Sequence, residues 1–400
     1  MQARFTTLVQ RARRPIPPPS AGEGGLRRGS GEGNPASGGL SFDRGQAAQS
    51  LPSPARSAGT LPHPSRACPT WADGDQSRAS PRLGGGRVLV QQISLSLLLL
   101  AATPAPAQEA IVTTQLGNAV EIVDLTTKKI LHTIPVAGAP AGIALSPDRA
   151  RAYVTRPEGH GVTVIDLANE KVLSELALPG GPLGVGVNPK SGEVYVADWF
   201  AERVFVLRAT SDGVALDGEI ATGKSPSGIA VTPDGATLLV ANRESDSVSV
   251  IDVATRKETR RIAVGTHPFG LTLSPDGTRA YTANVLSDDV SAIDITAGRE
   301  TGRVGTGQRP YVIAFAGERG FVTDQYSNTV TAFDPATMKK LGTVDVGDHP
   351  EGIAATRDGT TIVVANWGDN SLSLIDPTSL TVTGTVKTGD GPRSFGDFLR

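Results

Sequence analysis

Residues 232–265, TPDGATLLVANRESDSVSVIDVATRKETRRIAVG, decide the fold, because most of the chain after residue 107 consists of imperfect copies of them. TPDG indicates a turn, since Pro233 and Asp234 favour turns and Gly235 accepts a positive φ. LLVAN is an apolar run that predicts a buried strand, and SVSVID alternates with the period of a strand. Apolar runs at 228–231 and 261–264 complete the unit, which we predict to contain four strands.

Two independent markers count seven copies of this unit. A proline in a G-x-x-P or G-P setting recurs every 40 to 44 residues, at Pro140, Pro182, Pro226, Pro268, Pro310, Pro350 and Pro392. An aspartate that ends the third strand recurs at Asp124, Asp166, Asp252, Asp294, Asp334 and Asp376. In the remaining copy, Leu207 and Arg208 stand where this aspartate would fall.

A repeat of about 42 residues with four strands is typical of a β-propeller blade. We therefore expect residues 108–400 to form an all-β, seven-bladed propeller with four-stranded antiparallel blades. Residues 392–398 supply only a first strand, whereas residues 111–136 supply strands two to four. The ring is predicted to close by pairing the two ends of the chain in one blade, which also removes exposed sheet edges.

The second strands carry a recognisable motif, with Tyr153-Val154-Thr155, Tyr195-Val196-Ala197-Asp198, Tyr281-Thr282-Ala283-Asn284 and Val363-Val364-Ala365-Asn366. Together with the SPDG turn at 274–277, these segments resemble the Tyr-Val-Thr-Asn (YVTN) β-propeller repeat family over residues 111–398. The resemblance implies the fold and an exported binding module. Related propellers are similar to subunits of quinone-dependent dehydrogenases and to metal-dependent lactonases and lyases, so the motif does not fix a reaction.

The first 107 residues differ in composition from the repeats. Residues 1–86 are rich in Gly, Pro, Ser and Arg, and we interpret them as a disordered leader or as an upstream segment wrongly included in the protein. Residues 87–107, RVLVQQISLSLLLLAATPAPA, predict a signal peptide cleaved near Ala107, and hence a periplasmic or secreted protein. Its apolar core is too short for a bilayer span, so the mature chain is expected to have none.

Charge and cysteine usage exclude several functions. Residues 1–107 contain 12 arginines and five acidic residues, whereas residues 108–400 contain 26 basic and 35 acidic residues and carry a net charge of −9. This acidity disfavours nucleic acid as a partner. The single cysteine, Cys68, lies before the predicted cleavage site, which excludes disulfides, thiol catalysis and C-x-x-C-H haem attachment in the mature chain. We expect a monomer.

The loops that join strand four to strand one and strand two to strand three emerge on one face of a propeller, and here they vary most. A ligand-binding site is therefore predicted around the mouth of the central channel. Its candidates beside the prolines are His267, Phe269, Arg309, Tyr311, His349, Glu351 and Arg393. Those in the second loop set are Trp199, Arg243, Asp324, Tyr326 and Trp367.

Each group of candidates also has a structural interpretation. Asp198 and Asp324 share one blade position with Asn242, Asn284 and Asn366, which indicates side chains that cap loops. Trp199 and Trp367 fit loop packing as well as binding. His267 and His349 fit a hydrogen-bonded or solvated pair, but with Glu351 they would also make a two-histidine, one-carboxylate metal site.

No catalytic residue can be named, because the chain has no G-x-S-x-G elbow, H-E-x-x-H or EF-hand motif. The preferred hypothesis is a non-enzymatic propeller that binds a protein partner or small ligand, without a cofactor, at the channel mouth. One alternative is a metal-dependent lyase or hydrolase, or an accessory subunit of a quinone-dependent periplasmic dehydrogenase. A weaker one is single-stranded nucleic acid stacking on Trp199, Trp367, Phe269 and Tyr311.

Overall fold

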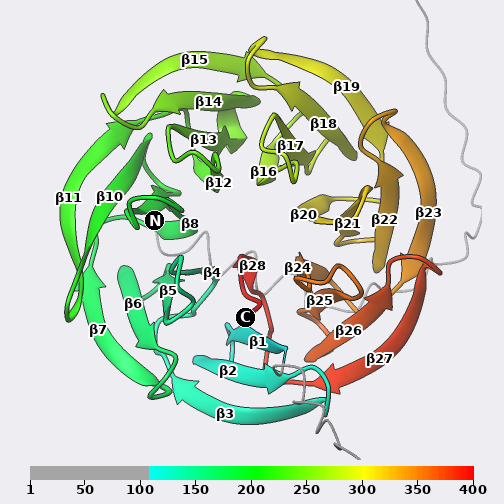
Figure 1. Ribbon diagram of the computed structural model, residues 1–400, viewed down its shortest axis with the longest axis horizontal. Helices are drawn as coiled ribbons and strands as arrows, with labels where there is room; N and C mark the ends of the chain where they lie inside the picture. The colour runs from blue at the N-terminus through cyan, green and yellow to red at the C-terminus, as the bar shows by residue number, and fades with distance from the viewer. Residues whose placement is uncertain (1–107) are drawn as a thin grey trace, which may run out of the picture. The chain divides into compact units, whose positions relative to one another are not determined.

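A computed structural model describes residues 108–400, so the leader and signal peptide predicted over residues 1–107 lie outside the described part. Residues 108–400 form a ring of seven sheets, each running from the central channel to the rim (Figure 1). The predicted all-β, seven-bladed propeller is confirmed. Within the described range the one helical element is the 3₁₀ turn η1 (Arg243–Ser245). No helix there is long and apolar enough to cross a membrane.

The strands follow the repeats along the chain. The first blade contains β1 (Glu109–Thr114), β2 (Ala119–Asp124) and β3 (Lys129–Pro135). The second contains β4 (Gly142–Leu145), β5 (Arg151–Arg156), β6 (Gly161–Asp166) and β7 (Lys171–Ala177). The third contains β8 (Pro182–Val187), β9 (Val194–Asp198), β10 (Arg203–Thr210) and β11 (Gly213–Ala221). The fourth contains β12 (Pro226–Val231), β13 (Thr237–Asn242), β14 (Ser247–Asp252) and β15 (Lys257–Ala263).

The remaining blades repeat this order. The fifth contains β16 (Pro268–Leu273), β17 (Arg279–Asn284), β18 (Asp289–Asp294) and β19 (Arg299–Gly305). The sixth contains β20 (Pro310–Ala316), β21 (Arg319–Asp324), β22 (Thr329–Asp334) and β23 (Lys339–Asp345). The seventh contains β24 (Pro350–Ala355), β25 (Ile362–Asn366), β26 (Ser371–Asp376) and β27 (Thr381–Lys387), and the chain ends with β28 (Phe395–Gly396).

The two ends of the described chain meet in the first blade, as predicted. Residues 392–400 run antiparallel to β1, where the N–H of Ile111 donates to the Phe398 carbonyl and the N–H of Arg393 to the Thr113 carbonyl, both at 2.8 Å. On its other side, β28 pairs in parallel with β4 of the second blade. The C-terminal segment therefore completes the first blade and joins it to its neighbour (Figure 1).

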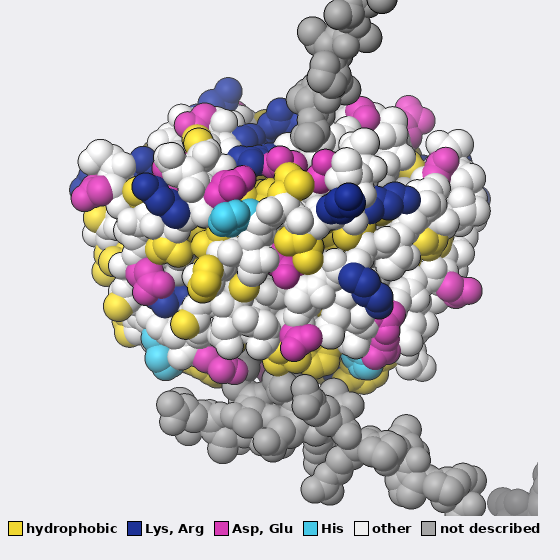
Figure 2. Space-filling model, turned by 90° about the horizontal axis from the view of Figure 1, so that it is seen from below, with side chains coloured by type: hydrophobic (Ala, Val, Ile, Leu, Met, Phe, Trp, Pro, Cys, Tyr) yellow, Lys and Arg dark blue, Asp and Glu magenta, His cyan; other side chains and the backbone are white. Residues whose placement is uncertain are grey.

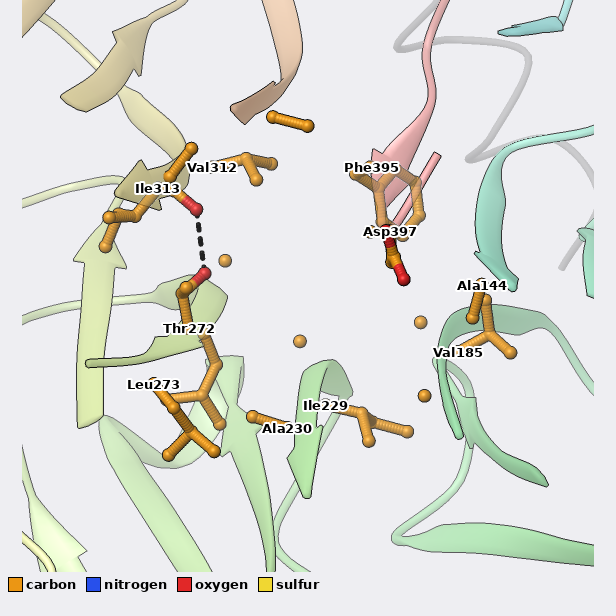
Figure 3. A pocket seen from close by; sticks show the side chains of 18 of the residues that line it. Ala144, Val185, Ile229, Ala230, Thr272, Leu273, Val312, Ile313, Phe395 and Asp397 are labelled. Carbon is orange, nitrogen blue, oxygen red and sulfur yellow. Dashed lines mark hydrogen bonds between the residues drawn. The ribbon is translucent and has the colours of Figure 1, made fainter. Parts of the chain in front are cut away.

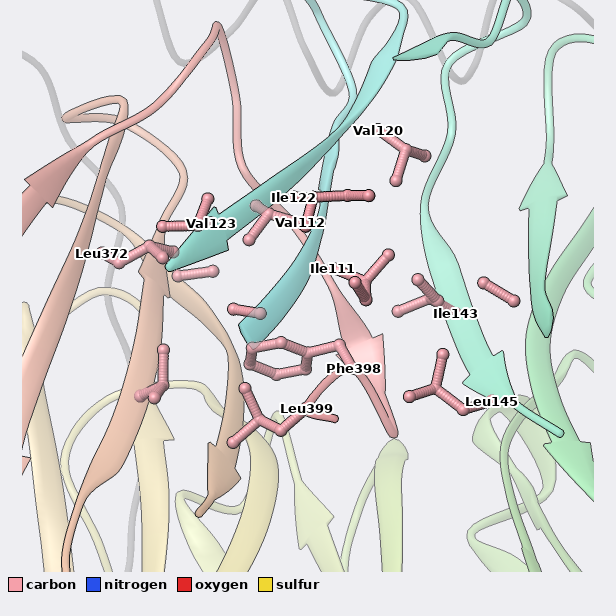
Figure 4. Close-up of a cluster of buried hydrophobic side chains, with 14 of the residues drawn as sticks. Ile111, Val112, Val120, Ile122, Val123, Ile143, Leu145, Leu372, Phe398 and Leu399 are labelled. Atoms are coloured by element: carbon pink, nitrogen blue, oxygen red, sulfur yellow. The ribbon is translucent and has the colours of Figure 1, made fainter. Parts of the chain in front are cut away.

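A hydrophobic cluster stabilises this closure (Figure 4). Ile111, Ile122, Ile143 and Phe398 are fully buried, and Leu399 is 5% exposed. These side chains come from both ends of the described chain and from the second blade. Because burial of each large apolar side chain contributes about 1.5–3 kcal/mol, the cluster holds the ring shut without a disulfide.

Two repeat motifs bring the inner strands together around the channel. A Cβ on Gly228 would lie 2.4 Å from the Phe269 carbonyl oxygen of the next blade, so the glycine of the P-x-G motif permits close approach. The threonine of the Y-V-T motif then bridges the blades, as Thr155 shows by donating through Oγ1 to the Leu183 carbonyl at 2.7 Å. The repeat residues thus set the distance between neighbouring inner strands. They also set the positions of the side chains that surround the channel mouth.

The turns on the opposite face are held by aspartates. Asp252, at the end of β14, accepts hydrogen bonds at 2.7 Å from the N–H and the hydroxyl of Thr255. The third blade lacks this aspartate, and there β10 continues through Leu207 and Arg208 to Thr210, with a bulge at Leu207, into the longer strand β11. The missing marker therefore corresponds to an extended hairpin.

The rim of the ring is formed by the fourth strand of each blade. In the view from the side of β3, hydrophobic side chains lie among acidic and basic ones (Figure 2). Exposed hydrophobic residues of this rim include Ile130 and Leu131 on β3 and Val382 on β27. Acidic and basic side chains are mixed in this view of the rim. Variants of exposed hydrophobic residues on the rim can therefore serve as controls for variants of the loop face.

Candidate functional site

The residues that precede the recurring prolines enter the inner strands in a left-handed conformation. His267, Arg309 and His349 have φ angles of 56°, 54° and 50°. Each backbone N–H donates to a side-chain oxygen in the preceding blade at 2.8 to 3.0 Å, the acceptors being Asp246 Oδ1, Asp288 Oδ1 and Asn328 Oδ1. Neighbouring blades thus hold these three positions in place through their backbones, which leaves the side chains available for contacts on the loop face.

Aromatic rings from three blades pack together where the inner strands begin. Phe269 stacks on Tyr311 with ring centroids 4.0 Å apart and meets Phe395 edge-on at 5.6 Å. Trp199 approaches Phe269 edge-on at 5.9 Å. Phe269, Tyr311 and Phe395 are 3%, 9% and 6% exposed. We call Phe269, Tyr311 and Phe395 the aromatic plug, because these buried rings pack against one another where the inner strands begin.

A buried ion pair lies beside the plug. Arg393 Nε is 2.6 Å from Glu351 Oε2, Gln325 Nε2 donates to Glu351 Oε1 at 2.7 Å, and Arg393 Nη2 donates to the Tyr311 hydroxyl at 2.8 Å. Burial raises the pKa of Glu351, and Arg393 and Gln325 oppose that rise. Burial also raises the pKa of Tyr311 to about 12, so this residue remains a neutral phenol at neutral pH. The Glu351 carboxylate thus interacts with Arg393 and Gln325.

A second group of side chains lies farther out on the same face. The Arg309 guanidinium lies 4.4 Å from the centroid of the Tyr326 ring, which meets His349 edge-on at 5.6 Å. His349 approaches Trp367 at 6.3 Å, and its Nδ1 is 2.8 Å from Asp348 Oδ1. We call Arg309, Tyr326, His349 and Trp367 the aromatic arc. Tyr326 is 51% exposed, which makes this arc accessible from solution.

A similar cation–aromatic pair lies in the third and fourth blades. The Arg243 guanidinium lies 5.3 Å from the centroid of the Trp199 ring. Arg243 also forms an ion pair with Glu244, and Glu244 Oε2 is 3.7 Å from His267 Nε2. Both tryptophans of the described chain therefore contact other candidate residues. Packing within the loops and a role in binding are thus compatible at these two positions.

Of the exposed apolar side chains of this face, the sequence interpretation identified Tyr326 and missed the others. The second residue after strand two of a blade is an exposed large hydrophobic in four blades: Leu116, Phe200, Leu286 and Tyr326. The other exposed large hydrophobics of residues 108–400 lie on outer strands. We call these four residues the loop tips. Phe200, Leu286 and Tyr326 each lie two residues after a recurring Asn or Asp, which was their signal in the sequence. Leu116 lacks this signal, because Thr114 occupies that position in the first blade.

The recurring Asn and Asp side chains lie beneath this surface. Asn242 is fully buried, accepts from the N–H of Gly223 at 2.9 Å and donates to Ser249 Oγ at 2.8 Å. Asp324 is also fully buried, and its Oδ2 accepts from Thr331 Oγ1 at 2.7 Å. Burial raises the pKa of Asp324. These contacts support the loop-capping interpretation, and they place Asp324 behind the mouth.

The candidate metal ligands do not converge. Among residues 108–400, no group of three or more His, Cys, Asp or Glu side chains is arranged to hold a metal ion. His267 faces Glu244, His349 contacts Asp348, and Glu351 is paired with Arg393. Separate partners thus engage the three side chains, and the structure does not bring His267, His349 and Glu351 together as the sequence suggestion of a metal site requires.

Comparison with known proteins supports the propeller fold. Residues 235–325 match a family model described as YNCE-like beta-propeller. No curated protein matches the chain significantly. The family-model match indicates a β-propeller, and it covers too little of the chain to assign the chain to one propeller family.

Solved structures with the same fold are distant in sequence. A chain of Kuenenia stuttgartiensis hydrazine synthase is 23% identical, with a TM-score of 0.58, and the match covers 64% of this chain and 89% of that one. A protein of unknown function from Desulfotomaculum acetoxidans is 17% identical, with a TM-score of 0.63 and coverages of 72% and 99%. Dihydro-heme d1 dehydrogenase NirN, in complex with DHE, is also 17% identical, with a TM-score of 0.56 and coverages of 74% and 75%. At these identities the similarity shows the fold alone.

Proposed function

We propose that this protein is an exported, YVTN-type binding module that docks a protein partner on its loop face. The observation that carries the proposal is the ring of exposed loop tips, Leu116, Phe200, Leu286 and Tyr326, around the channel mouth. Exposed apolar side chains gathered on one face mark interaction surfaces. Aromatic residues and arginine, present here as the Arg309–Tyr326 and Arg243–Trp199 pairs, are enriched in protein interfaces.

A protein partner suits this face better than a small ligand does. The aromatic plug is buried at the channel mouth, whereas the exposed groups are distributed over several blades. A broad surface with buried rings at its centre matches the geometry of a protein interface more closely than that of a concave ligand pocket.

The charge of the face specifies the partner further. Its two loop sets carry eight acidic and four basic side chains: Glu158, Glu202, Glu244, Asp246, Asp288, Asp348, Asp369 and Asp390 against Lys224, Arg243, Arg309 and Arg393, the last of which is paired with Glu351. Complementary charge accelerates association and selects partners. We therefore propose a partner with a basic contact surface. The same charges would repel the phosphates of single-stranded nucleic acid.

We further propose, by analogy with two fold neighbours, that this partner belongs to a periplasmic redox system. These two neighbours are named as a hydrazine synthase and a dehydrogenase. The segment 87–107 has the pattern of a secretory signal peptide, which supports export. We propose a binding role, with no reaction assigned to the propeller itself.

The test compares two matched sets of surface variants. The loop-tip variant carries Leu116→Ser, Leu286→Ser and Tyr326→Ser, and the rim variant carries Ile130→Ser, Leu131→Ser and Val382→Ser. Each protein, expressed from the full-length sequence, is used to capture partners from the periplasm of its own cells at low and high salt. A partner held by wild type and the rim variant but lost by the loop-tip variant and at high salt supports the proposal. Equal capture by all three proteins would overturn it.

A further inference from the structure

The central channel contains a cavity that the proposed docking face does not use. Its volume is ≈ 460 Å³, within the range of about 300–1,000 Å³ typical of small-molecule pockets. The walls come from the inner strands β4, β8, β12, β16, β20 and β24 and from β28 (Figure 3). Phe269 and Phe395 of the aromatic plug line one end. The cavity therefore lies behind the plug.

Solvent reaches this cavity from the face opposite the loop tips. The inner strands β8, β16 and β24 are buried where they begin, beside the plug, and partly exposed where they end. Val187, Leu273 and Ala355 lie at those exposed ends and line the cavity. A ligand that enters here would leave the loop face uncovered, so the two sites are independent.

The lining contains one ionisable side chain, that of Asp397. The other lining residues are glycines, aliphatic residues, one threonine and the rings of Phe269, Phe315 and Phe395. Figure 3 shows the Asp397 carboxylate among these side chains and directed into the open space. A single negative charge within a mainly apolar wall complements a ligand with one positive charge and an apolar body.

The Asp397 carboxylate is held by the Arg149 guanidinium and by the backbone N–H of Leu399. Arg149 Nη1 donates to Asp397 Oδ1 at 2.8 Å and to the Leu399 carbonyl at 2.6 Å. The Asp397 side chain is 50% exposed, and partial desolvation raises its pKa while the positive charges of Arg149 and Arg357 oppose that rise. Since an ionised carboxylate accepts several hydrogen bonds, these contacts leave acceptor capacity toward the cavity.

The phenylalanine rings of the wall add a second attraction for a cation, carried mainly by Phe315, because Phe269 stacks on Tyr311 and the Arg393 guanidinium lies over Phe395. The negative face of an aromatic ring favours ammonium groups, more strongly where water is excluded. Phe269, Phe315 and Phe395 all contribute to the lining, and Val185 and Ile229 provide apolar wall between them. We propose that the channel binds an organic ammonium ion, with the ammonium group on Asp397 and its apolar part against the inner strands.

The test measures binding of hexylammonium, hexanol and hexanoate to the purified protein by isothermal titration calorimetry. A charge-assisted hydrogen bond contributes about 1.5–3 kcal/mol, so hexylammonium should bind at least about tenfold more tightly than hexanol. Hexanoate should bind least, because Asp397 repels it. Equal affinities for the ammonium and the alcohol, or no detectable binding of the ammonium, would overturn the proposal.

Variants locate the site. Asp397→Asn should weaken hexylammonium binding about tenfold or more, whereas Asp234→Asn, which replaces an aspartate outside the lining, should leave it unchanged. Ala230→Leu, which fills part of the cavity, should weaken hexylammonium and hexanol alike and decides the location if Asp397→Asn does not fold. Unchanged affinity in both cavity variants would contradict the site. Partner capture on the loop face should persist in all three variants, so failure of this proposal is distinct from failure of the docking surface.

Discussion

Nε of Arg393 lies 2.6 Å from Oε2 of Glu351, and this contact joins the seventh blade to the strand that closes the first. The two side chains are 13% and 6% exposed. Removing two charges from water is costly, and only close pairing compensates for that cost. The pair therefore ties the stability of the ring closure to the packing of the aromatic plug.

Removing one partner of this pair should destabilise the propeller strongly. Glu351→Ala leaves the Arg393 guanidinium buried without a counter-charge, and we expect the free energy of unfolding to fall by about 3–5 kcal/mol. Urea unfolding followed by circular dichroism measures the change. The double variant Glu351→Leu with Arg393→Met should recover much of the loss, because it removes both charges.

The control for this prediction is an exposed ion pair on the rim. Arg261 pairs with Glu258 at 2.7 Å, and Arg261→Ala should cost about 1 kcal/mol or less. If Glu351→Ala costs no more than Arg261→Ala, the buried pair does not have the structural role assigned to it.

The P-x-G glycine should tolerate no side chain. Gly228→Ala would place a Cβ 2.4 Å from the Phe269 carbonyl oxygen, which forces neighbouring inner strands apart. Gly305→Ala is the matched control, since nothing lies within 4 Å of its added Cβ. We expect Gly228→Ala to lower the free energy of unfolding by about 1–3 kcal/mol, as overpacking does, and Gly305→Ala to be neutral or slightly stabilising. Equal stabilities of the two variants would show that the inner strands are not packed at their limit.

Stability should fall in acid because of the turn aspartates. Hydrogen bonds from Ser274 and Thr278 lower the pKa of Asp276 from 3.8 to about 2, and those from Thr356 and Thr360 lower the pKa of Asp358 equally far. A carboxyl with a lower pKa in the folded state stabilises the fold fully above its unfolded pKa, and this contribution is lost as the pH falls toward the folded value. The melting temperature should therefore drop between about pH 4 and pH 2.

Buried carboxyls act in the opposite direction. Burial raises the pKa values of Glu121, Asp324 and Glu351, so their protonation favours the folded state at pH values above this window. The double variant Asp276→Asn with Asp358→Asn should lose less stability between pH 4 and pH 2 than wild type does. A melting temperature that stays constant over this range in wild type would contradict the prediction.

The fold could be predicted from the sequence because each recurring residue of the repeat has a local structural role. The P-x-G glycine marks the close approach of inner strands, and the terminal aspartate of strand three marks a hydrogen-bonded turn. The third blade shows the limit of this logic, since Leu207 and Arg208 simply extend the hairpin of β10 and β11. The pattern gave the number of blades and the closure, because both depend on the phase of short repeats.

The arrangement of side chains within the site could be predicted from the sequence only in part. The sequence indicated that Phe269, Tyr311, Glu351 and Arg393 surround the mouth, and the structure brings them together. Whether they fill the channel or leave it open depends on its diameter, which no local pattern encodes. Leu116 and Leu286 were missed because apolar residues next to a strand look like its continuation.

The left-handed positions before the prolines separate binding from stability. Arg309 and Ala139 both lie near φ = 55°, at 54° and 57°, where a side chain is strained and glycine is not. Arg309→Gly keeps its backbone donor to Asp288 but removes the cation over Tyr326. We expect both Arg309→Gly and Ala139→Gly to hold or raise the free energy of unfolding by up to about 1 kcal/mol. Only Arg309→Gly should weaken partner capture on the loop face, and an equal loss of capture in both variants would mean that loop geometry, not the Arg309 side chain, carries the interaction.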